Sequence, residues 1–278
     1  MSKTHSLENL FSVSGKVAAI TGAAGVLCGQ MAKALASLGA KVAILDLRKD
    51  AADKLATELS DAGGQALAVE CNVLDRSSVE KAADTIISKW NKVDILINGA
   101  GGNKKEATAT DELKFFDIPA EAMKFVFELN IVGTMIPSQI FAKQMIKQDE
   151  GNIINISSMC AFQPLTKVVG YSAAKAGVSN FTQWLAVHLA QNYSKNIRVN
   201  AIAPGFFLTE QNRFLLTDEK TGELTPRGKT IIEHTPLGRF GEPDELISTL
   251  IWLLGPGAKF VTGIVVPVDG GFSAFSGV

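Results

Sequence analysis

The stretch KVAAITGAAGVLCG, residues 16–29, runs from a short apolar segment through a glycine-containing turn into a segment of helical period. The apolar segment has almost no polar side chains, which is typical of a strand that is covered on both faces of a sheet. Small residues at the turn let backbone N–H groups approach a pyrophosphate, which the positive end of the helix dipole also attracts. The stretch therefore predicts the first strand, turn and helix of a nucleotide-binding sheet, although a tight turn that needs glycine for its dihedral angles would look the same.

The alternation of short strands and longer helices continues to the end of the chain. After the helix predicted over 26–38, further strands are predicted at 41–46, 65–70, 93–98, 151–157, 196–203 and 263–268. Further helices are predicted at 50–62, 76–90, 119–148, 168–192 and 243–254. Such alternation indicates βαβ units and a parallel sheet. The predicted fold class is α/β, a Rossmann-type doubly wound parallel sheet with three α/β/α layers, in a single domain over 1–278.

One long segment, at about 205–240, does not fit the sheet because its centre is polar and rich in turn-forming residues. A long excursion between two core elements is more often a lid or a binding loop than a spacer. We therefore predict a substrate lid here, with a surface loop of no special role as the alternative.

Composition limits the classes of partner. The chain of 278 residues is 46% hydrophobic, and its 27 basic and 28 acidic residues give a net charge of −1. A chain without a broad positive field is not expected to bind nucleic acid or an anionic membrane. The start MSKTHSLENLF lacks the apolar run of a signal peptide, and no stretch reaches the roughly 18 uninterrupted apolar residues of a membrane span. We expect a soluble cytoplasmic protein.

The three cysteines, Cys28, Cys71 and Cys160, stand in apolar or small-residue contexts. They lack the paired spacing of a zinc site. The sequence predicts buried, reduced thiols and no metal site.

Polar residues at the strand ends predict which cofactor binds. Asp46 ends the second strand about twenty residues after the glycine turn, where a carboxylate can bind the 2′-hydroxyl of an adenine ribose and repel a 2′-phosphate. This favours NAD(H), but NADP(H) stays open because Arg48 could accommodate a phosphate. Asn72 follows the third strand and could contact the adenine, and NGAG at 98–101 closes the fourth strand with little bulk. Each could also be an ordinary strand-end residue or turn.

The stretch YSAAKAG, residues 171–177, carries the candidate chemistry. Tyr171 and Lys175 share a helix face at i and i+4, and a nearby ammonium stabilises a phenolate and lowers the pKa of the tyrosine. A hydroxyl from Ser157 or Ser158, at the end of the preceding strand, could donate to a substrate carbonyl oxygen. Asn130 lies in a predicted buried helix, where an amide without a partner is costly. The alternatives are a solvated helix face and serines that satisfy backbone groups.

These motifs together are similar to those of a known family. The TG after the first strand, NGAG for the usual NNAG, Asn130, ISS, YSAAK, RVNAIAPG and VDGG resemble the short-chain dehydrogenases/reductases from about Leu10 to the end. The resemblance implies that Ser158, Tyr171 and Lys175 are catalytic and that Asn130 holds a water in a proton relay. It also implies that Lys175 holds the nicotinamide ribose. The implied cofactor contacts are Gly22, Ala24, Gly25, Val26, Leu27, Asp46, Asn72, Val73, Asn98, Gly99, Ala100, Tyr171, Lys175, Pro204, Gly205 and Thr209.

The chain departs from the family pattern at the glycine turn. The usual turn reads T-G-x-x-x-G-x-G, but here Val26 and Cys28 stand at the last two glycine positions, with Gly25 and Gly29 one residue to the side. The path of this turn is therefore open. Asn72 replaces the commoner aspartate, and an amide can still form a hydrogen bond at that position.

Within the family, GVLCG, NGAGGN, ISSMCAFQPLTK and APGFFLTEQNR look like the bacterial D-mannonate oxidoreductase group, or short-chain fructuronate reductases. The resemblance implies hydride transfer between NAD(H) and a sugar-acid ketone, with D-fructuronate and D-mannonate as the expected pair. The alternatives are a gluconate 5-dehydrogenase-like or other polyol or keto-acid reductase, and a non-catalytic dinucleotide sensor. Family members commonly form homotetramers through the helices that correspond to 119–148 and 168–192, so a homotetramer is expected.

A hexuronate substrate carries a carboxylate that needs a cation, and arginine suits bidentate pairing. Arg213 is the preferred candidate, because it follows Thr209 by one helical turn if the lid begins as a helix. The other residues proposed to contact the substrate are Asn103, Lys104 and Lys167. Arg239, at the far end of the lid, could only anchor its hinge.

Overall fold

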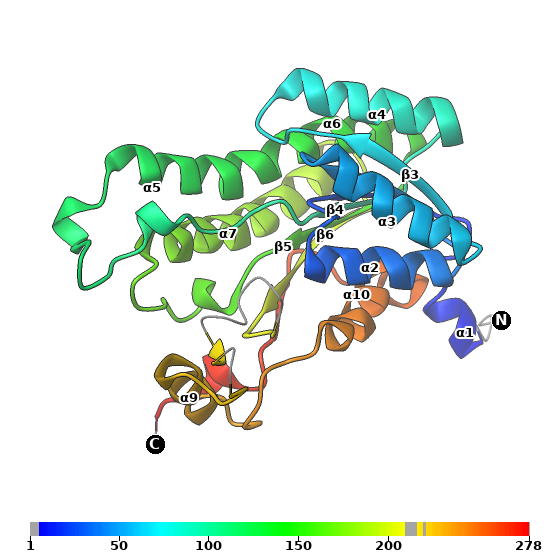
Figure 1. The fold of residues 1–278 in the computed structure, drawn as a ribbon. Coiled ribbons are helices and arrows are strands. Elements are labelled where there is room, and N and C mark those ends of the chain that lie inside the picture. Colours follow the sequence, from blue (N-terminus) through cyan, green and yellow to red (C-terminus); the bar gives the residue numbers. More distant parts are fainter. Residues whose placement is uncertain (1–5, 209–215, 219–220, 278) are drawn as a thin grey trace.

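The computed structural model describes residues 6–208, 216–218 and 221–277 of the chain. Its centre is a parallel sheet of seven strands in the order β3-β2-β1-β4-β5-β6-β7 (Figure 1). The strands are β1 Val17–Thr21, β2 Lys41–Asp46, β3 Gln65–Glu70, β4 Ile95–Asn98, β5 Gly151–Ile156, β6 Ile197–Pro204 and β7 Val265–Val268. The predicted Rossmann-type doubly wound α/β fold in a single domain is confirmed.

Helices cover both faces of the sheet (Figure 1). Alternate residues of β1 belong to two different apolar clusters, Ala18 and Ile20 to one and Val17 and Ala19 to the other. The first cluster includes α2 Val26–Ser37, α3 Lys49–Asp61 and α10 Ile247–Leu254, and the second includes α4 Arg76–Trp90, α6 Gly133–Gln148 and α7 Val169–Asn192. Burial on both faces explains why the strands read as continuous apolar runs.

The helix predicted over 119–148 is not regular. It consists of α5 Ala120–Phe127, a π-helical turn at Glu128–Val132, and α6. By length and composition the whole stretch is apolar enough to cross a membrane, but half of its most apolar window is buried inside the protein. Because it packs against α4 and α7, we interpret it as a core helix. The cytoplasmic location stays a prediction.

The C-terminal third adds elements that the sequence did not predict. Within the segment 205–240, Phe207 forms an isolated parallel bridge with Gly241, and Thr217 forms an antiparallel bridge with Leu224. The helix α9 Pro226–Glu233 follows and lies at the end of the molecule that also holds the C-terminus (Figure 1). The predicted helix at 243–254 is a 3-10 turn, Pro243–Leu246, followed by α10. A short α1, Leu7–Leu10, precedes the sheet.

Candidate active site

A cavity of about 480 Å³ opens at the carboxyl ends of the central strands. The chain runs from β1 to its neighbour β2 on one side, whereas the other neighbour, β4, comes later in the sequence. Such a switch point is where open α/β sheets bind their ligands. Ten of the predicted cofactor residues line the cavity: Gly22, Gly25, Val26, Leu27, Asp46, Gly99, Ala100, Tyr171, Lys175 and Gly205.

Two turns pack backbone against backbone at the floor of this cavity. Gly22 has a φ of +63°, and a Cβ there would lie 2.8 Å from the Cα of Ala100. The Oγ1 atom of Thr21 accepts hydrogen bonds from the N–H groups of Gly99 and Ala100, at 3.1 and 3.2 Å. The TG motif therefore needs glycine for both conformation and space, and its threonine joins the end of β1 to the turn after β4.

The structure explains why a cysteine can stand at position 28, where the family turn usually has glycine. A Cβ on Gly99 would lie 2.1 Å from the Sγ atom of Cys28. The thiol thus fills space that the side chain of an asparagine in the usual NNAG motif would enter. The two departures, cysteine at 28 and glycine at 99, are complementary. Burial raises the pKa of the Cys28 thiol to about 12, and all three cysteines are buried and free, as predicted.

Asp46 is buried but still reaches the cavity. One carboxylate oxygen accepts a hydrogen bond from the N–H of Ala24 at 3.0 Å, and the other accepts one from the N–H of Arg48 at 3.0 Å. The Nε atom of Arg48 lies 3.6 Å from the same carboxylate. Asp46 therefore fixes the glycine turn in addition to lining the cavity, and Arg48 is drawn toward the carboxylate.

Two predicted cofactor residues use their side chains for local structure. The Oδ1 atom of Asn72 accepts a hydrogen bond from the N–H of Leu74 at 3.0 Å, which matches the alternative interpretation of a turn residue. The Nδ2 atom of Asn98 donates to Ser138 and Asn155, at 2.9 and 2.8 Å, in the core. Val73 is also buried in the core. Pro204 ends β6, and Thr209 lies outside the described residues.

Ser158, Tyr171 and Lys175 come together as predicted. Ser158 follows β5, and its Oγ accepts a hydrogen bond from the N–H of Cys160 at 3.3 Å. Tyr171 and Lys175 stand on the first turns of α7. The Nζ atom of Lys175 donates to the carbonyl of Ile156 at 2.7 Å and lies 5.6 Å from the centre of the Tyr171 ring. The neighbouring Ser157 instead bonds to the Lys175 carbonyl and to Ser179, so it has a structural role.

The pKa values correct one expectation. Removal from water raises the pKa of Tyr171 above its usual value, and the buried thiol of Cys160 adds to this effect, while Ser158 opposes it. The predicted lowering is thus absent: Ser158, not Lys175, is the neighbour that lowers the pKa of Tyr171, and desolvation outweighs its effect. Burial lowers the pKa of Lys175 to about 8. The phenol is therefore held in its protonated form, ready to donate.

Asn130 occupies the π-helical turn between α5 and α6 and is fully buried. Its Nδ2 donates to the carbonyls of Gly102 and Val126, at 2.7 and 2.8 Å, and its Oδ1 accepts from the N–H of Gly102 at 3.1 Å. These hydrogen bonds give the Asn130 amide a structural role, because they join the π-helical turn to the loop after β4. The water that the resemblance assigns to Asn130 stays a prediction.

None of the predicted substrate residues that the structure describes lines the cofactor cavity. The side chain of Asn103 donates to Thr108 at 2.8 Å, and Lys104 stands 5.2 Å above the ring of Phe125. Lys167 lines a second cavity. Arg213 lies outside the described residues. Arg239 donates twice to Glu245, at 2.7 and 2.6 Å, and is therefore an anchor.

Sequence reasoning missed several residues that line the cofactor cavity. They are Gly101, Gly102, Ile156, Phe206 and Phe207. Cys28 and Arg48 also line it, and the sequence analysis named them only as an unusual turn residue and as a possible phosphate contact. Most of the missed residues adjoin motifs that the sequence analysis quoted, so proximity to NGAG and to PGFF was an available signal. Among the described residues, no group of three or more His, Cys, Asp or Glu side chains could hold a metal ion.

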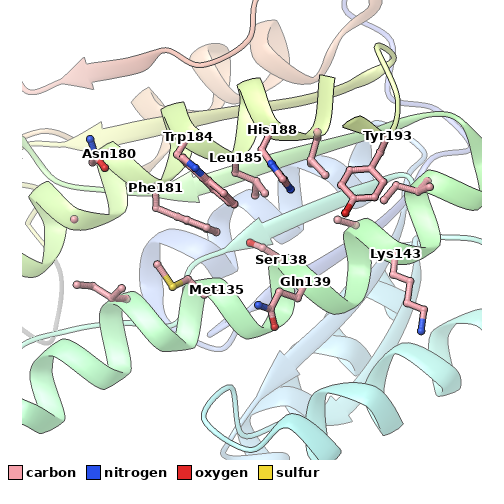
Figure 2. A pocket seen from close by; sticks show the side chains of 15 residues that line it. Met135, Ser138, Gln139, Lys143, Asn180, Phe181, Trp184, Leu185, His188 and Tyr193 are labelled. Atoms are coloured by element: carbon pink, nitrogen blue, oxygen red, sulfur yellow. The ribbon is translucent and has the colours of Figure 1, made fainter. Parts of the chain in front are cut away.

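A groove of about 840 Å³ lies away from this chemistry, between α6 and α7. Figure 2 shows Phe181, Trp184 and His188 of α7 facing Met135 and Gln139 of α6. Trp184 stacks on His188, with ring centres 4.5 Å apart, and on Phe181, at 6.3 Å. The groove is mainly apolar and aromatic, and Ser158, Tyr171 and Lys175 are not among the residues that line it.

The fold and the site together define a nucleotide-binding oxidoreductase, with a hydroxyl, a phenol and an ammonium at one end of a cavity lined by small residues. The chain belongs to the short-chain dehydrogenase family, whose sequence profile matches residues 16–220.

Three relatives are highly similar along their whole length. The chain is 49% identical to an uncharacterized oxidoreductase, UxuB, of Bacillus subtilis strain 168, covering 98% of both chains. It is 48% identical to an uncharacterized oxidoreductase of Haemophilus influenzae, covering 99% of this chain and 96% of that protein. A solved structure with bound NAD, described as that of a candidate D-mannonate oxidoreductase from Haemophilus influenza, is 47% identical with a TM-score of 0.90, covering 96% of this chain and 98% of that one.

Proposed function

We propose that this protein is an NAD-linked oxidoreductase that interconverts the ketone of a sugar acid and the corresponding alcohol, with D-fructuronate and D-mannonate as the pair. The observation that carries the chemical class is that Tyr171 and Lys175 line the cofactor cavity and that the Ser158 side chain forms a hydrogen bond with Tyr171. The choice of substrate is supported by the Haemophilus structure, whose name refers to D-mannonate.

The residues fit a nicotinamide dinucleotide. The floor of the cavity consists of backbone and small side chains, since a Cβ on Gly22 would meet Ala100 and a Cβ on Gly101 would lie 2.7 Å from the Oδ1 of Asn130. Asp46 at the end of β2 would hold the adenine ribose, and Lys175 would hold the nicotinamide ribose. When bound, the cofactor supplies or accepts a hydride.

In the reducing direction, the protein's own groups deliver the proton. Because desolvation keeps Tyr171 protonated, its hydroxyl can donate to the substrate oxygen as negative charge develops there. The Ser158 hydroxyl donates a second hydrogen bond to the same oxygen and stabilises that charge. The ammonium of Lys175 would stabilise the phenolate that remains after the proton has left.

The experiment is a screen of NADH oxidation over keto-hexonates, hexuronates and neutral ketoses. Turnover of D-fructuronate with the highest kcat/KM would support the proposal. Highest activity on 5-ketogluconate would instead identify a gluconate 5-dehydrogenase-like enzyme. NADH binding without turnover of any substrate would favour a dinucleotide sensor.

The cofactor preference is proposed from Asp46. Its buried carboxylate, held by the N–H groups of Ala24 and Arg48, would repel a 2′-phosphate, so kcat/KM should be higher with NADH than with NADPH. Equal values, or a preference for NADPH, would show that Arg48 overrides the carboxylate.

We also propose a homotetramer in which the groove between α6 and α7 is covered by the same face of a second copy (Figure 2). Trp184 and Tyr193, which line this groove, are 55% and 58% exposed, and large exposed apolar patches usually mark an interface. Two long helices related by a twofold axis would form a self-complementary contact. Light scattering at micromolar concentration tests this, and a monomer would refute it.

A further inference from the structure

A second cavity, of about 780 Å³, opens between the loop that follows β5 and helix α9. Phe206 lines both this cavity and the cofactor cavity. Leu165 and Tyr171 pack against the buried cluster that contains Phe272, and both Leu165 and Phe272 also line the second cavity. The second cavity therefore adjoins the reacting end of the cofactor cavity, close to the catalytic phenol.

The ionisable side chains of this second cavity are all basic. They are Lys167 on the loop, Arg227 on α9 and His234 directly after α9, and no Asp or Glu is among the described residues that line it. Gln163 and Thr166 add an amide and a hydroxyl on the loop side. Walls that carry one sign of charge concentrate ligands of the opposite sign. The lining is therefore suited to an anion that also carries hydroxyl groups.

Arg227 is the cation best placed to bind such an anion. It is partly buried in the first turn of α9. Within the part of the chain that the structure describes, its guanidinium has no hydrogen-bond or ion-pair partner. In contrast, Arg239 is held by Glu245, and the buried Arg198 donates to the carbonyls of Val261 and Leu253. The guanidinium of Arg227 is therefore available to pair with a ligand in the cavity.

We propose that Arg227 binds the carboxylate of a polyhydroxylated acid substrate and that Lys167, across the cavity, is the second cation, an inference that rests on the function proposed above. The planar guanidinium pairs with a carboxylate through two parallel hydrogen bonds. Tyr171 and Ser158 act on the ketone and do not need the acid group, so a separate cation determines specificity for acids. Sequence reasoning named Lys167 but assigned the principal role to Arg213, which lies outside the described residues.

Lys167 offers a clean substitution. Its backbone has a φ of +73°, a left-handed conformation that favours glycine, and its carbonyl accepts a hydrogen bond from the N–H of Ala109 at 2.8 Å. Lys167→Gly should therefore keep the backbone of the loop in place while it removes the side chain that carries the ammonium. On α9, Lys229 is an exposed cation outside the cavity lining, so Lys229→Gln is a matched control for Arg227→Gln.

The kinetic test compares D-fructuronate with D-fructose, which has a hydroxymethyl group in place of the carboxylate. For Arg227→Gln, kcat/KM should fall roughly tenfold or more with the acid, mainly through KM, and by less than about threefold with the neutral ketose. Arg227→Lys should recover part of this loss, and Lys167→Gly should show a smaller, equally selective loss. Lys229→Gln should match the parent. Equal losses on both substrates, or no loss on the acid, would overturn the assignment.

A binding measurement separates this inference from the proposed function. Calorimetric titration with D-mannonate and with D-mannitol, in the presence of NADH so that the alcohols cannot be oxidised, should show tighter binding of the acid to the parent and loss of that preference in Arg227→Gln. If the parent bound both equally, the inference would be wrong even if D-fructuronate were turned over. If the acid preference depended on Arg227 but no sugar acid were turned over, the inference would hold and the proposed function would fail.

Discussion

The contact between Cys28 and Gly99 can be tested by a double-mutant cycle. In Gly99→Ala, the new methyl group would lie 2.1 Å from the Sγ atom of Cys28 and 2.8 Å from the carbonyl of Thr21. Overpacking of this kind costs about 1–3 kcal/mol in the free energy of unfolding. Cys28→Ala removes the sulfur and keeps a good helix former, at a cost of about 1 kcal/mol for the lost buried contact.

The double variant should be more stable than the sum of the single effects predicts, with a coupling of about 1 kcal/mol or more, because the alanine methyl takes the place of the sulfur. The overlap with the Thr21 carbonyl is present in both backgrounds and does not enter the coupling. Urea unfolding of the four proteins gives the energies. Cys71→Ala is the control, because Cys71 is buried in the apolar cluster on the opposite face of the sheet, and it should combine additively with Gly99→Ala. Additivity for Cys28 within about 0.5 kcal/mol would refute the compensation.

Three further predictions concern the catalytic residues and the assembly. Tyr171→Phe should lower kcat by roughly a hundredfold or more while NADH affinity, measured by fluorescence titration, stays close to that of the parent; activity within a few-fold would contradict the acid role. Burial lowers the pKa of Lys175 in the folded protein to about 8, below its ordinary value of 10.5. The unfolded state therefore binds more protons between these pH values, and stability rises with pH across that window. Relative to Lys175→Met, the parent should gain on the order of 3 kcal/mol in free energy of unfolding from pH 8 to 10.5, and parallel pH profiles would argue against a desolvated lysine. Trp184→Glu should dissociate the oligomer in light scattering, whereas an unchanged mass would exclude the α6–α7 face as an essential contact.

The sequence by itself determined the fold and indicated the candidate reacting groups. Strands that are apolar on both faces are stable when helices cover both sides of the sheet. The alternation of such strands with segments of helical period therefore indicated a doubly wound sheet. The spacing of Tyr171 and Lys175 placed them on one helix face, which is a local property. The strand end at Ser158 supplied the third group, because the carboxyl ends of parallel strands meet at one edge of the sheet.

The tertiary structure decided properties that depend on contacts between distant segments. The pKa of Tyr171 rises rather than falls because packing removes water from the phenol, and no spacing along one helix can report that packing. Asn98 turns into the core because Ser138 and Asn155 meet it there. Arg227 becomes a candidate for substrate binding only because α9 folds across from the loop after β5. The complementarity of Cys28 and Gly99 has the same origin. The two residues are 71 positions apart in the sequence, and only folding brings the Cys28 thiol against the Cα of Gly99, where it leaves no room for a side chain.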